Sequence, residues 1–327
     1  MSRLSASRFA RHFALDVPIA LAPMALATGG ALAAACTKAG ALGLVGAGYG
    51  ELAWTQREYA LALELGVRER TGCGFITWKL EEDASALDWV LEQRPRAVML
   101  SFGDPRPYAG RIAAGGAALI CQVQRLEQVP VALEAGAQVI VAQGAEAGGH
   151  GMAGFDARAT FTLVPEIADW LAANASGTLL LAAGGIADGR GLAASMVLGA
   201  DGALVGTRLW ASAESLASAA AKDVAVRASG DGTARSAIFD IVRRKNWPAM
   251  FDFRCVRNDL HRQWEGRIDE LRSAPDSVRA QYDAAVNAGD FTRAHVTVGE
   301  ATGLVRDVLP AGEIIARMGR EAQALLR

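Results

Sequence analysis

The amino-acid sequence predicts an α/β fold, a (β/α)8 TIM barrel with a smaller helical domain inserted before the C-terminal helix. Two observations lead to this fold class. Eight short runs rich in Val, Ile, Leu and Ala recur between residues 18 and 207, and segments with helical spacing of apolar residues separate them. The runs are continuously apolar, which indicates parallel strands that are buried on both faces and covered by helices.

The eight predicted strands follow one another along the chain at intervals that suit one βα unit each. They span residues 18–24, 42–48, 70–77, 97–102, 118–123, 138–144, 178–185 and 202–207. Helices are expected between them, for example over residues 51–65, 81–93 and 189–198. A doubly wound parallel sheet uses the same alternation and is the alternative fold.

The composition changes after residue 209. Residues 216–295 gain arginines and aromatic side chains without a further continuously apolar run, which predicts a small helical domain. The barrel would then comprise residues 1–215 plus 296–327. Over residues 313–326, Ile314 and Met318 stand four positions apart, as do Ala322 and Leu326, so an amphipathic helix is expected to pack on the barrel as its eighth helix.

Composition and charge exclude several classes of protein. The chain of 327 residues is 51% hydrophobic and has a formal net charge of −2, which excludes a disordered chain. A dedicated nucleic-acid binder is excluded as well, because it needs a basic face. The uncharged run over residues 17–37 contains Pro23 and Gly29-Gly30, so we expect no membrane segment.

The cysteines and histidines indicate neither a metal site nor a disulfide framework. The four cysteines are widely spaced and form no CxxC pair, so neither a zinc knuckle nor a thioredoxin-like motif is available. Reduced thiols are typical of cytoplasmic proteins, and a cytoplasmic location is expected. His12, His261 and His295 are isolated in the sequence, which argues against metal ligation.

Glycines follow the seventh and eighth predicted strands. Gly184 and Gly185 end the seventh run, and Gly206 and Thr207 end the eighth. The loops after these two strands of a barrel often hold a phosphate on backbone N–H groups, and glycine keeps a Cβ away from the anion. A tight turn is the alternative for either pair alone, but the occurrence of both pairs favours a phosphate site.

The loop after the sixth predicted strand is the most informative segment. The sixth and seventh runs begin 40 positions apart, at residues 138 and 178, the largest such interval in the barrel. The loop contains Gln143, Glu146 and His150 among glycines, at the end of the barrel where function resides. An imidazole suits proton abstraction or hydrogen bonding to a developing anion, so His150 is a candidate catalytic residue.

Two further segments offer polar or backbone groups at the barrel mouth. Ala22-Pro23-Met24 ends the first predicted strand, and the proline is expected to leave nearby amide and carbonyl groups free to meet a planar ligand. Gln122 is polar within an apolar run and therefore needs a buried partner. It could point to a heterocycle or to a backbone group of the barrel.

Taken in order, these motifs resemble those of the nitronate monooxygenases, formerly called 2-nitropropane dioxygenases. The resemblance covers essentially the whole chain. It rests on residues 18–24, 38–48, 72–77, 143–150, 183–189, 206–208 and 299–305. The Glu-Ala-Gly-Gly-His segment at residues 146–150 is specific to this family and to related FMN-dependent enoyl-ACP reductases.

The resemblance implies an FMN-containing barrel that oxidises alkyl nitronates, and nitroalkanes as a further substrate class, with O2 to a carbonyl compound and nitrite. His150 would be the catalytic base. The residues implied in cofactor binding are Ala22, Pro23 and Met24 against the isoalloxazine, Gln122 near its pyrimidine edge, Gln143, Gly148 and Gly149 along the cofactor, and Gly184, Gly185, Gly206 and Thr207 at the phosphate.

The sequence departs from the family pattern at two places. Many members carry an Asn in the third-strand motif and a Lys at the fifth strand, whereas this chain has Gly72-Cys73-Gly74-Phe75 and Gln122. The flavin environment, and with it the electron donor, can therefore differ. An FMN-dependent NAD(P)H:quinone or enoyl-thioester reductase is one alternative function, and a non-redox barrel that binds a phosphorylated metabolite is another.

Overall fold

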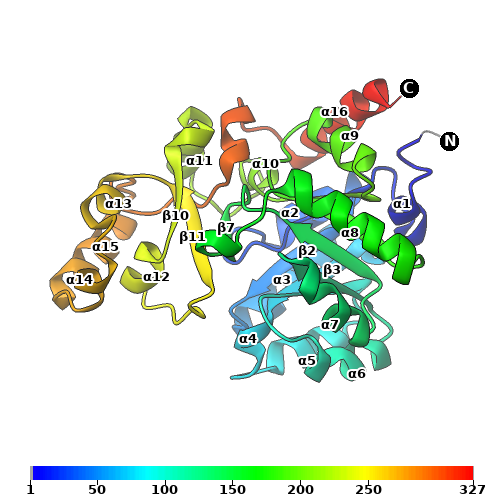
Figure 1. Ribbon diagram of the computed structural model, residues 1–327, viewed down its shortest axis with the longest axis horizontal. Helices are drawn as coiled ribbons and strands as arrows, with labels where there is room; N and C mark the ends of the chain where they lie inside the picture. The colour runs from blue at the N-terminus through cyan, green and yellow to red at the C-terminus, as the bar shows by residue number, and fades with distance from the viewer. Residues whose placement is uncertain (1–2, 327) are drawn as a thin grey trace.

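The computed structural model describes residues 3–326 and contains the predicted barrel (Figure 1). Eight parallel strands form one sheet in the order β1-β9-β8-β6-β5-β4-β3-β2. An isolated parallel bridge between Ala20 and Leu42 joins β1 to β2 and closes the sheet. The expected (β/α)8 architecture is therefore confirmed, and the doubly wound alternative is excluded.

Each barrel strand lies within one of the eight predicted runs. The strands are β1 (Ile19–Leu21), β2 (Gly43–Gly48), β3 (Thr71–Ile76), β4 (Ala97–Ser101), β5 (Ala118–Val123), β6 (Val139–Gln143), β8 (Leu179–Ala183) and β9 (Gly202–Val205). Their side chains are buried on both faces, with Gln122 as the one partly exposed strand residue. Continuous apolar character identified these strands because both of their faces are covered.

Helices surround the barrel and also close its base. Phe9 and Phe13 of α1 pack among the side chains that fill the barrel interior, such as Leu44 and Met99. The helices of this part are α1 (Arg8–Phe13), α2 (Gly30–Lys38), α3 (Leu52–Leu65), α4 (Thr77–Leu80), α5 (Ser85–Glu92), α6 (Arg106–Ala114), α7 (Val129–Glu134), α8 (Thr160–Asn174), α9 (Gly189–Val197), α10 (Thr207–Trp210) and α16 (Ala311–Leu325).

The C-terminal helix packs on the barrel as the sequence predicted. One face of α16 carries Ile314, Met318 and Ala322 into the apolar layer between the helices and the outer side of the strands. It lies against α9 and α2, and it brings the two ends of the chain to the same side of the molecule (Figure 1). Short 3-10 turns occur at Arg68–Arg70, Leu126–Gln128, Gly154–Asp156, Gly230–Gly232 and Glu300–Leu304.

Residues 216–295 form a mainly helical body beside the barrel, but this segment also contains two strands that the sequence analysis did not predict (Figure 1). Its elements are α11 (Ala219–Arg227), β10 (Thr233–Ser236), α12 (Ile238–Val242), β11 (Phe251–Val256), α13 (Asp259–Trp264), α14 (Ile268–Arg272) and α15 (Asp276–Ala288). In β11, buried Phe251, Phe253 and Cys255 alternate with partly exposed residues, so this strand lacks the continuously apolar run that marks the barrel strands.

The strand β11 connects this segment to the barrel. It pairs antiparallel with β10 on one side and, on the other, with β7 (Gly149–Met152), a short strand within the long loop after β6. The glycine loop is therefore the edge strand of a three-stranded sheet. The division into a barrel of residues 1–215 plus 296–327 and a domain of residues 216–295 stays a prediction.

Two general features complete the description. The four cysteines, Cys36, Cys73, Cys121 and Cys255, are free and buried. Among residues 3–326, no helix is long and apolar enough to cross a membrane.

Candidate functional site

One cavity of about 520 Å³ lies at the carboxyl ends of the barrel strands, where the barrel meets residues 216–295. This volume is within the range usual for small-molecule and cofactor sites. All residues that the sequence suggested for the site line this cavity. They are Ala22, Pro23, Met24, Gln122, Gln143, Gly148, Gly149, His150, Gly184, Gly185, Gly206 and Thr207. Residues from five barrel strands or their loops thus meet in one place.

Three glycines form a smooth wall at the ends of β8 and β9. Gly184 and Gly185 have φ angles of +101° and +77°, which L side chains rarely adopt, and a Cβ on Gly184 would lie 2.9 Å from Thr160 Oγ1. A Cβ on Gly206 would instead meet only Ala22 Cβ and Met24 Sδ, each at 3.7 Å. The wall is therefore bare backbone, which fits the close approach of a phosphate.

Thr207 lies beside the second of these glycines and binds the late glycine motif. Its Oγ1 accepts a hydrogen bond of 2.9 Å from the backbone N–H of Gly299. The backbone of Gly299 also lies close to the long loop after β6. A Cβ on Gly299 would be only 2.4 Å from the carbonyl oxygen of Glu146. The motif at residues 299–305 thus supports the cavity from behind.

A chain of glutamine side chains crosses the cavity wall from β5 to β7. Gln122 Nε2 donates to Gln143 Oε1 over 3.1 Å, and Gln124 Nε2 donates to the same oxygen over 3.0 Å. Gln143 Nε2 then donates to the backbone oxygen of His150 over 3.2 Å. Gln143 is the partner that the polar Gln122 was expected to have, and this chain fixes the backbone of His150.

Residues 22–24 pack closely against two neighbouring strands, β2 and β3, at positions where these strands have glycine. A Cβ on Gly74 would lie 2.2 Å from Pro23 Cγ, and one on Gly46 would lie 2.5 Å from the carbonyl oxygen of Met24. The expectation of free backbone groups is wrong for the N–H and the oxygen of both Ala22 and Met24. Met24 N–H donates to the oxygen of Ala22 and to Thr28 Oγ1, and that hydroxyl donates to Ala22 in turn.

A buried arginine of residues 216–295 holds the long loop that follows β6. Arg235 of β10 donates hydrogen bonds to the backbone oxygens of Gly149 and Ala147, over 3.1 and 2.8 Å, and reaches that of Ala145 at 3.3 Å. It also donates to the oxygen of Asp252 over 2.6 Å. Burial lowers the pKa of Arg235 to about 10, so the guanidinium stays charged at neutral pH.

Glu146, the carboxylate of this loop, is engaged in a structural role. Both of its oxygens accept from the backbone N–H of Thr160 at 3.0 Å, and Oε2 also accepts from the hydroxyl of the same residue. Because Thr160 is the first residue of α8, the carboxylate stabilises the start of that helix. Of the ionisable side chains in the loop, His150 is the one left for chemistry.

His150 is enclosed by side chains of residues 216–295. Its Nε2 lies 2.9 and 3.0 Å from the two carboxylate oxygens of Asp240, and its ring stacks on that of Trp247 with centroids 3.4 Å apart. Phe253 lies against it at 4.9 Å. Burial lowers the pKa of His150 below its usual value, although Asp240 acts in the opposite direction. A neutral imidazole that can accept a proton results.

A second histidine, His295, also faces the cavity. It is isolated in the sequence, but in the structure its Nδ1 lies 2.6 Å from the hydroxyl of Tyr282. Burial lowers the pKa of His295 to about 3, and burial raises that of Tyr282 to about 12. Both groups are therefore uncharged near neutral pH. Among residues 3–326, no group of three or more His, Cys, Asp or Glu side chains could hold a metal ion.

Sequence reasoning missed Asp240, Arg243 and Trp247, which all belong to residues 216–295 and reach the site. Asp240 and Trp247 contact His150, and Arg243 lines the cavity with Nη1 3.9 Å from Asp240. The available signal is the gain of arginine and aromatic residues after residue 209, which by itself indicates only a change of domain.

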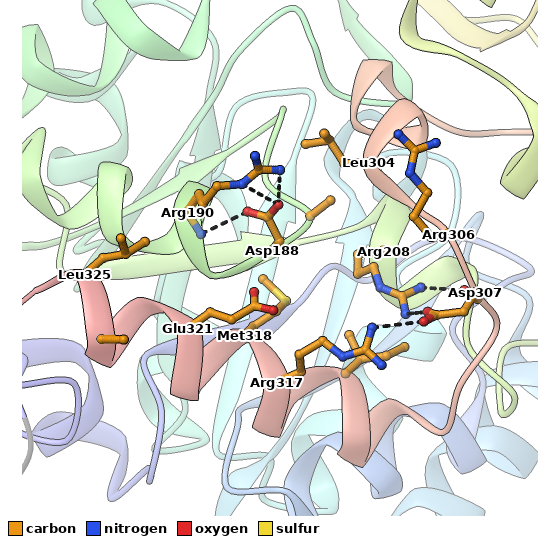
Figure 2. A pocket seen from close by; sticks show the side chains of 13 residues that line it. Asp188, Arg190, Arg208, Leu304, Arg306, Asp307, Arg317, Met318, Glu321 and Leu325 are labelled. Atoms are coloured by element: carbon orange, nitrogen blue, oxygen red, sulfur yellow. Dashed lines mark hydrogen bonds and ion pairs between the residues drawn. The ribbon is translucent and has the colours of Figure 1, made fainter.

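A second cavity of about 590 Å³ lies between α9 and α16, away from all of these residues (Figure 2). Its cationic side chains are largely paired. Arg190 is bound to Asp188, and Arg208 and Arg317 are both bound to Asp307 (Figure 2). The paired charges make this cavity a poor site for a phosphate, so the glycine-lined cavity is the candidate site.

Comparisons with known proteins agree with this geometry. A sequence model of the family described as nitronate monooxygenase matches residues 55–321. Nitronate monooxygenase npaC of Metarhizium robertsii is 37% identical over 335 residues, which cover 93% of this chain and 90% of that protein. The nitronate monooxygenase of Neurospora crassa is 31% identical, over 94% and 89%. The solved structure of FabK from Thermotoga maritima has a TM-score of 0.82 at 26% identity, over 98% and 97%.

Proposed function

Because the chain belongs to the nitronate monooxygenase family of flavin-dependent oxidoreductases, we propose that it uses FMN and O2 to oxidise alkyl nitronates to a carbonyl compound and nitrite. Neutral nitroalkanes are the second substrate class of the proposal. The observation that carries it is the meeting of a buried, neutral His150 with a bare glycine wall in one cavity of about 520 Å³. A cytoplasmic location is part of this proposal, and the free, buried cysteines are in line with it.

The residues present fit a flavin mononucleotide. Gly184, Gly185, Gly206 and Thr207 would hold its phosphate, because three of them present backbone without a side chain. Ala22, Pro23 and Met24 would lie against the isoalloxazine, with Gln122 near its pyrimidine edge. Gln143, Gly148 and Gly149 would line the cofactor. When bound, FMN supplies the transfer of electrons from the nitronate to O2.

The protein contributes position, exclusion of water and a proton acceptor. His150 would remove the α-proton of a neutral nitroalkane or hydrogen-bond the nitro group of a nitronate. Trp247 and Phe253 cover its ring and keep water from it. The lowered pKa of His150 keeps the imidazole neutral at pH 7, as a base requires.

The proposal is tested by purifying the protein and identifying its cofactor and reaction. We expect a flavin absorption band, FMN as the flavin released on denaturation, and O2 consumption with nitrite release when propionate 3-nitronate is added. A preparation that takes up no flavin even after addition of FMN would refute the proposal. A colourless protein that a sugar phosphate stabilises would favour the non-redox alternative.

Anaerobic mixing separates the oxidase reaction from the reductase alternative. We expect the nitronate to bleach the flavin rapidly and NADH to leave it oxidised. Rapid bleaching by NADH with none by the nitronate would instead establish a nicotinamide-dependent reductase.

The role of His150 is tested by His150→Ala. This variant should retain FMN and lose about 10²- to 10⁴-fold of its rate on neutral nitroalkanes, the usual contribution of a general base. The rate on preformed nitronates should fall much less, since they need no proton abstraction. An equal loss on both substrates would contradict the role of His150 as the base.

A further inference from the structure

We propose that Asp240 is a positioning residue that holds the proton of His150 on Nε2, so that Nδ1 is the atom that takes the α-proton of a neutral nitroalkane. This inference rests on the proposed function, because it concerns the proton transfer to His150. Asp240 lies 90 positions from His150 in the sequence, and no motif of the sequence analysis includes it.

The contact between the two side chains determines which nitrogen carries the proton. Nε2 lies 2.9 and 3.0 Å from Oδ1 and Oδ2 of Asp240, and both side chains are buried, with 7% and 6% of their surface exposed. A carboxylate only accepts hydrogen bonds, so Nε2 must donate. In a neutral imidazole the other nitrogen, Nδ1, then has a free lone pair.

The packing around the ring fixes this arrangement. Trp247 stacks on one face with an interplanar angle of 10°, and Phe253 and Phe102 lie around it at centroid distances of 4.9 and 6.3 Å. A half-turn of the ring about its Cβ–Cγ bond would place a carbon instead of Nε2 at Asp240 and leave the buried carboxylate without its hydrogen bond. Such a loss is costly for a buried charge.

Nδ1 is the remaining ring atom that can bind a proton. Among residues 3–326, no hydrogen bond to this nitrogen is formed, whereas His150 as a whole lines the cavity. The indole and the carboxylate cover a face of the ring and Nε2. Nδ1 is therefore the nitrogen of the imidazole that is left for the substrate.

The charges that face His150 come from three neighbouring groups. Asp240 of α12 favours the imidazolium, while Arg243, which follows α12, and Arg235 of β10 oppose it, as burial does. Arg243 Nη1 is 3.9 Å from Asp240 Oδ1. Asp240 is thus the group that stabilises a proton on the ring, and without it His150 would be a weaker base.

The proton transfer is balanced without any further reactant. The Cα–H bond of the nitroalkane breaks, and its proton forms a bond to Nδ1. The electron pair of that bond moves into a C=N bond, and the negative charge comes to rest on the nitro oxygens as a nitronate. Nε2 keeps its proton and donates a hydrogen bond to Asp240 throughout, so the imidazolium that forms is paired with a carboxylate.

The first experiment compares Asp240→Asn with Asp252→Asn in the holoenzyme. Asp252 lies on β11 in the same sheet, but its side chain does not contact His150, so this control should behave as the wild type. Nitrite release is measured with nitroethane and with preformed ethylnitronate across a pH series. In Asp240→Asn we expect a loss of about 10- to 100-fold on nitroethane, as for other carboxylates that orient a histidine, and little change on ethylnitronate.

The pH profile distinguishes positioning from a general loss of structure. Without the carboxylate the pKa of His150 falls further, so the acid limb of the nitroethane profile should move to lower pH. If Asp240→Asn lost equal activity on both substrates and the acid limb of its nitroethane profile stayed where it is in the wild type, the proposal would be overturned. A wild-type enzyme that releases no nitrite from ethylnitronate would refute the proposed function itself, and the inference about the ring would then be decided by spectroscopy.

The second experiment reads the position of the proton directly by 15N NMR of protein labelled at histidine. The chain has four histidines, and His150→Gln assigns the signal of His150. In the wild type we expect a protonated Nε2 and an unprotonated Nδ1, and in Asp240→Asn a mixture of the two tautomers. A proton on Nδ1 in the wild type would overturn the proposal, and this measurement does not need the enzyme to turn over.

Discussion

The indole ring of Trp247 lies flat on the imidazole ring of His150, with centroids 3.4 Å apart and planes inclined by 10°. Trp247 belongs to the loop between α12 and β11, and its Nε1 donates a hydrogen bond of 3.2 Å to the hydroxyl of Tyr49. Its ring also meets those of Trp78 and Phe102, at 5.4 and 5.1 Å. A loop of residues 216–295 therefore reaches across the barrel mouth and covers the imidazole.

Replacing this indole should make His150 more basic. Burial is the largest cause of its lowered pKa, so Trp247→Leu should let the pKa rise towards the usual value near 6.5. The acid limb of the nitroethane rate should then move to higher pH, because the base must be unprotonated to act. Trp78→Leu is the control, since Trp78 contacts Trp247 and not His150. An unmoved limb in Trp247→Leu would show that the indole does not control solvation of the ring.

Gly206→Ala should weaken FMN binding without unfolding the protein. The added Cβ would make only ordinary contacts at 3.7 Å, so the melting temperature of the apoprotein should stay unchanged. FMN should bind at least about tenfold more weakly, a loss of about 1.4 kcal/mol, because the methyl group would stand between the backbone and the phosphate. Titration of apoprotein with FMN, followed by flavin fluorescence, measures this.

A matched glycine elsewhere provides the control for that titration. Gly177 lies before β8, and a Cβ there would meet nothing within 4 Å. Gly177→Ala should bind FMN as the wild type does. Wild-type affinity in Gly206→Ala would show that the phosphate does not lie at the end of β9.

Arg235→Met should destabilise the loop that carries His150. The substitution keeps an apolar stem and removes the donors to the backbone oxygens of Ala147, Gly149 and Asp252, which would be left buried without partners. We expect a loss of at least about 3 kcal/mol in the free energy of unfolding. Hydrogen exchange should quicken over residues 145–152. Arg262→Met removes an exposed arginine and should change neither quantity; unaltered exchange in Arg235→Met would contradict the role of Arg235.

His295 should make the protein sensitive to acid. Its pKa of about 3 in the folded state is below the usual 6.5, so the unfolded state binds the proton first as the pH falls. Stability is therefore lost from about pH 6.5 downward, by on the order of 3 kcal/mol between pH 7 and pH 4. His295→Asn keeps an acceptor for the hydroxyl of Tyr282 and should reduce this dependence. The urea midpoints of the wild type and of His295→Asn at pH 7 and pH 4 measure this dependence. An equal loss of stability between the two pH values in both proteins would contradict the role of His295.

The barrel could be predicted from sequence because its signal is local. Val139–Gln143 and Leu179–Ala183, for example, are continuously apolar because both faces of each strand are covered. The glycines at residues 184–185 and 206 mark strand ends in the same local way. The residues that the barrel strands and their glycine loops contribute to the site could therefore be proposed from the sequence, whereas those of residues 216–295 could not.

The partners of His150 could not be predicted in this way. Asp240 is one acidic residue among 35 in the chain, and its relation to His150 depends on how β11 pairs with β7. That pairing joins a strand of alternating burial to a glycine-rich strand, and neither resembles the barrel strands. The contacts of a side chain across such a distance follow from the tertiary fold alone.

The pairing of β7 with β11 also bears on how the protein matures. Closing a loop of about 100 residues is entropically unfavourable until the contacts at its ends form, so such pairings tend to arise late in folding. During synthesis, all eight barrel strands leave the ribosome before Asp240 and Phe253 do. We therefore expect a nascent or truncated chain without these residues to lack an organised base, so that the onset of turnover on neutral nitroalkanes would report the last stage of folding.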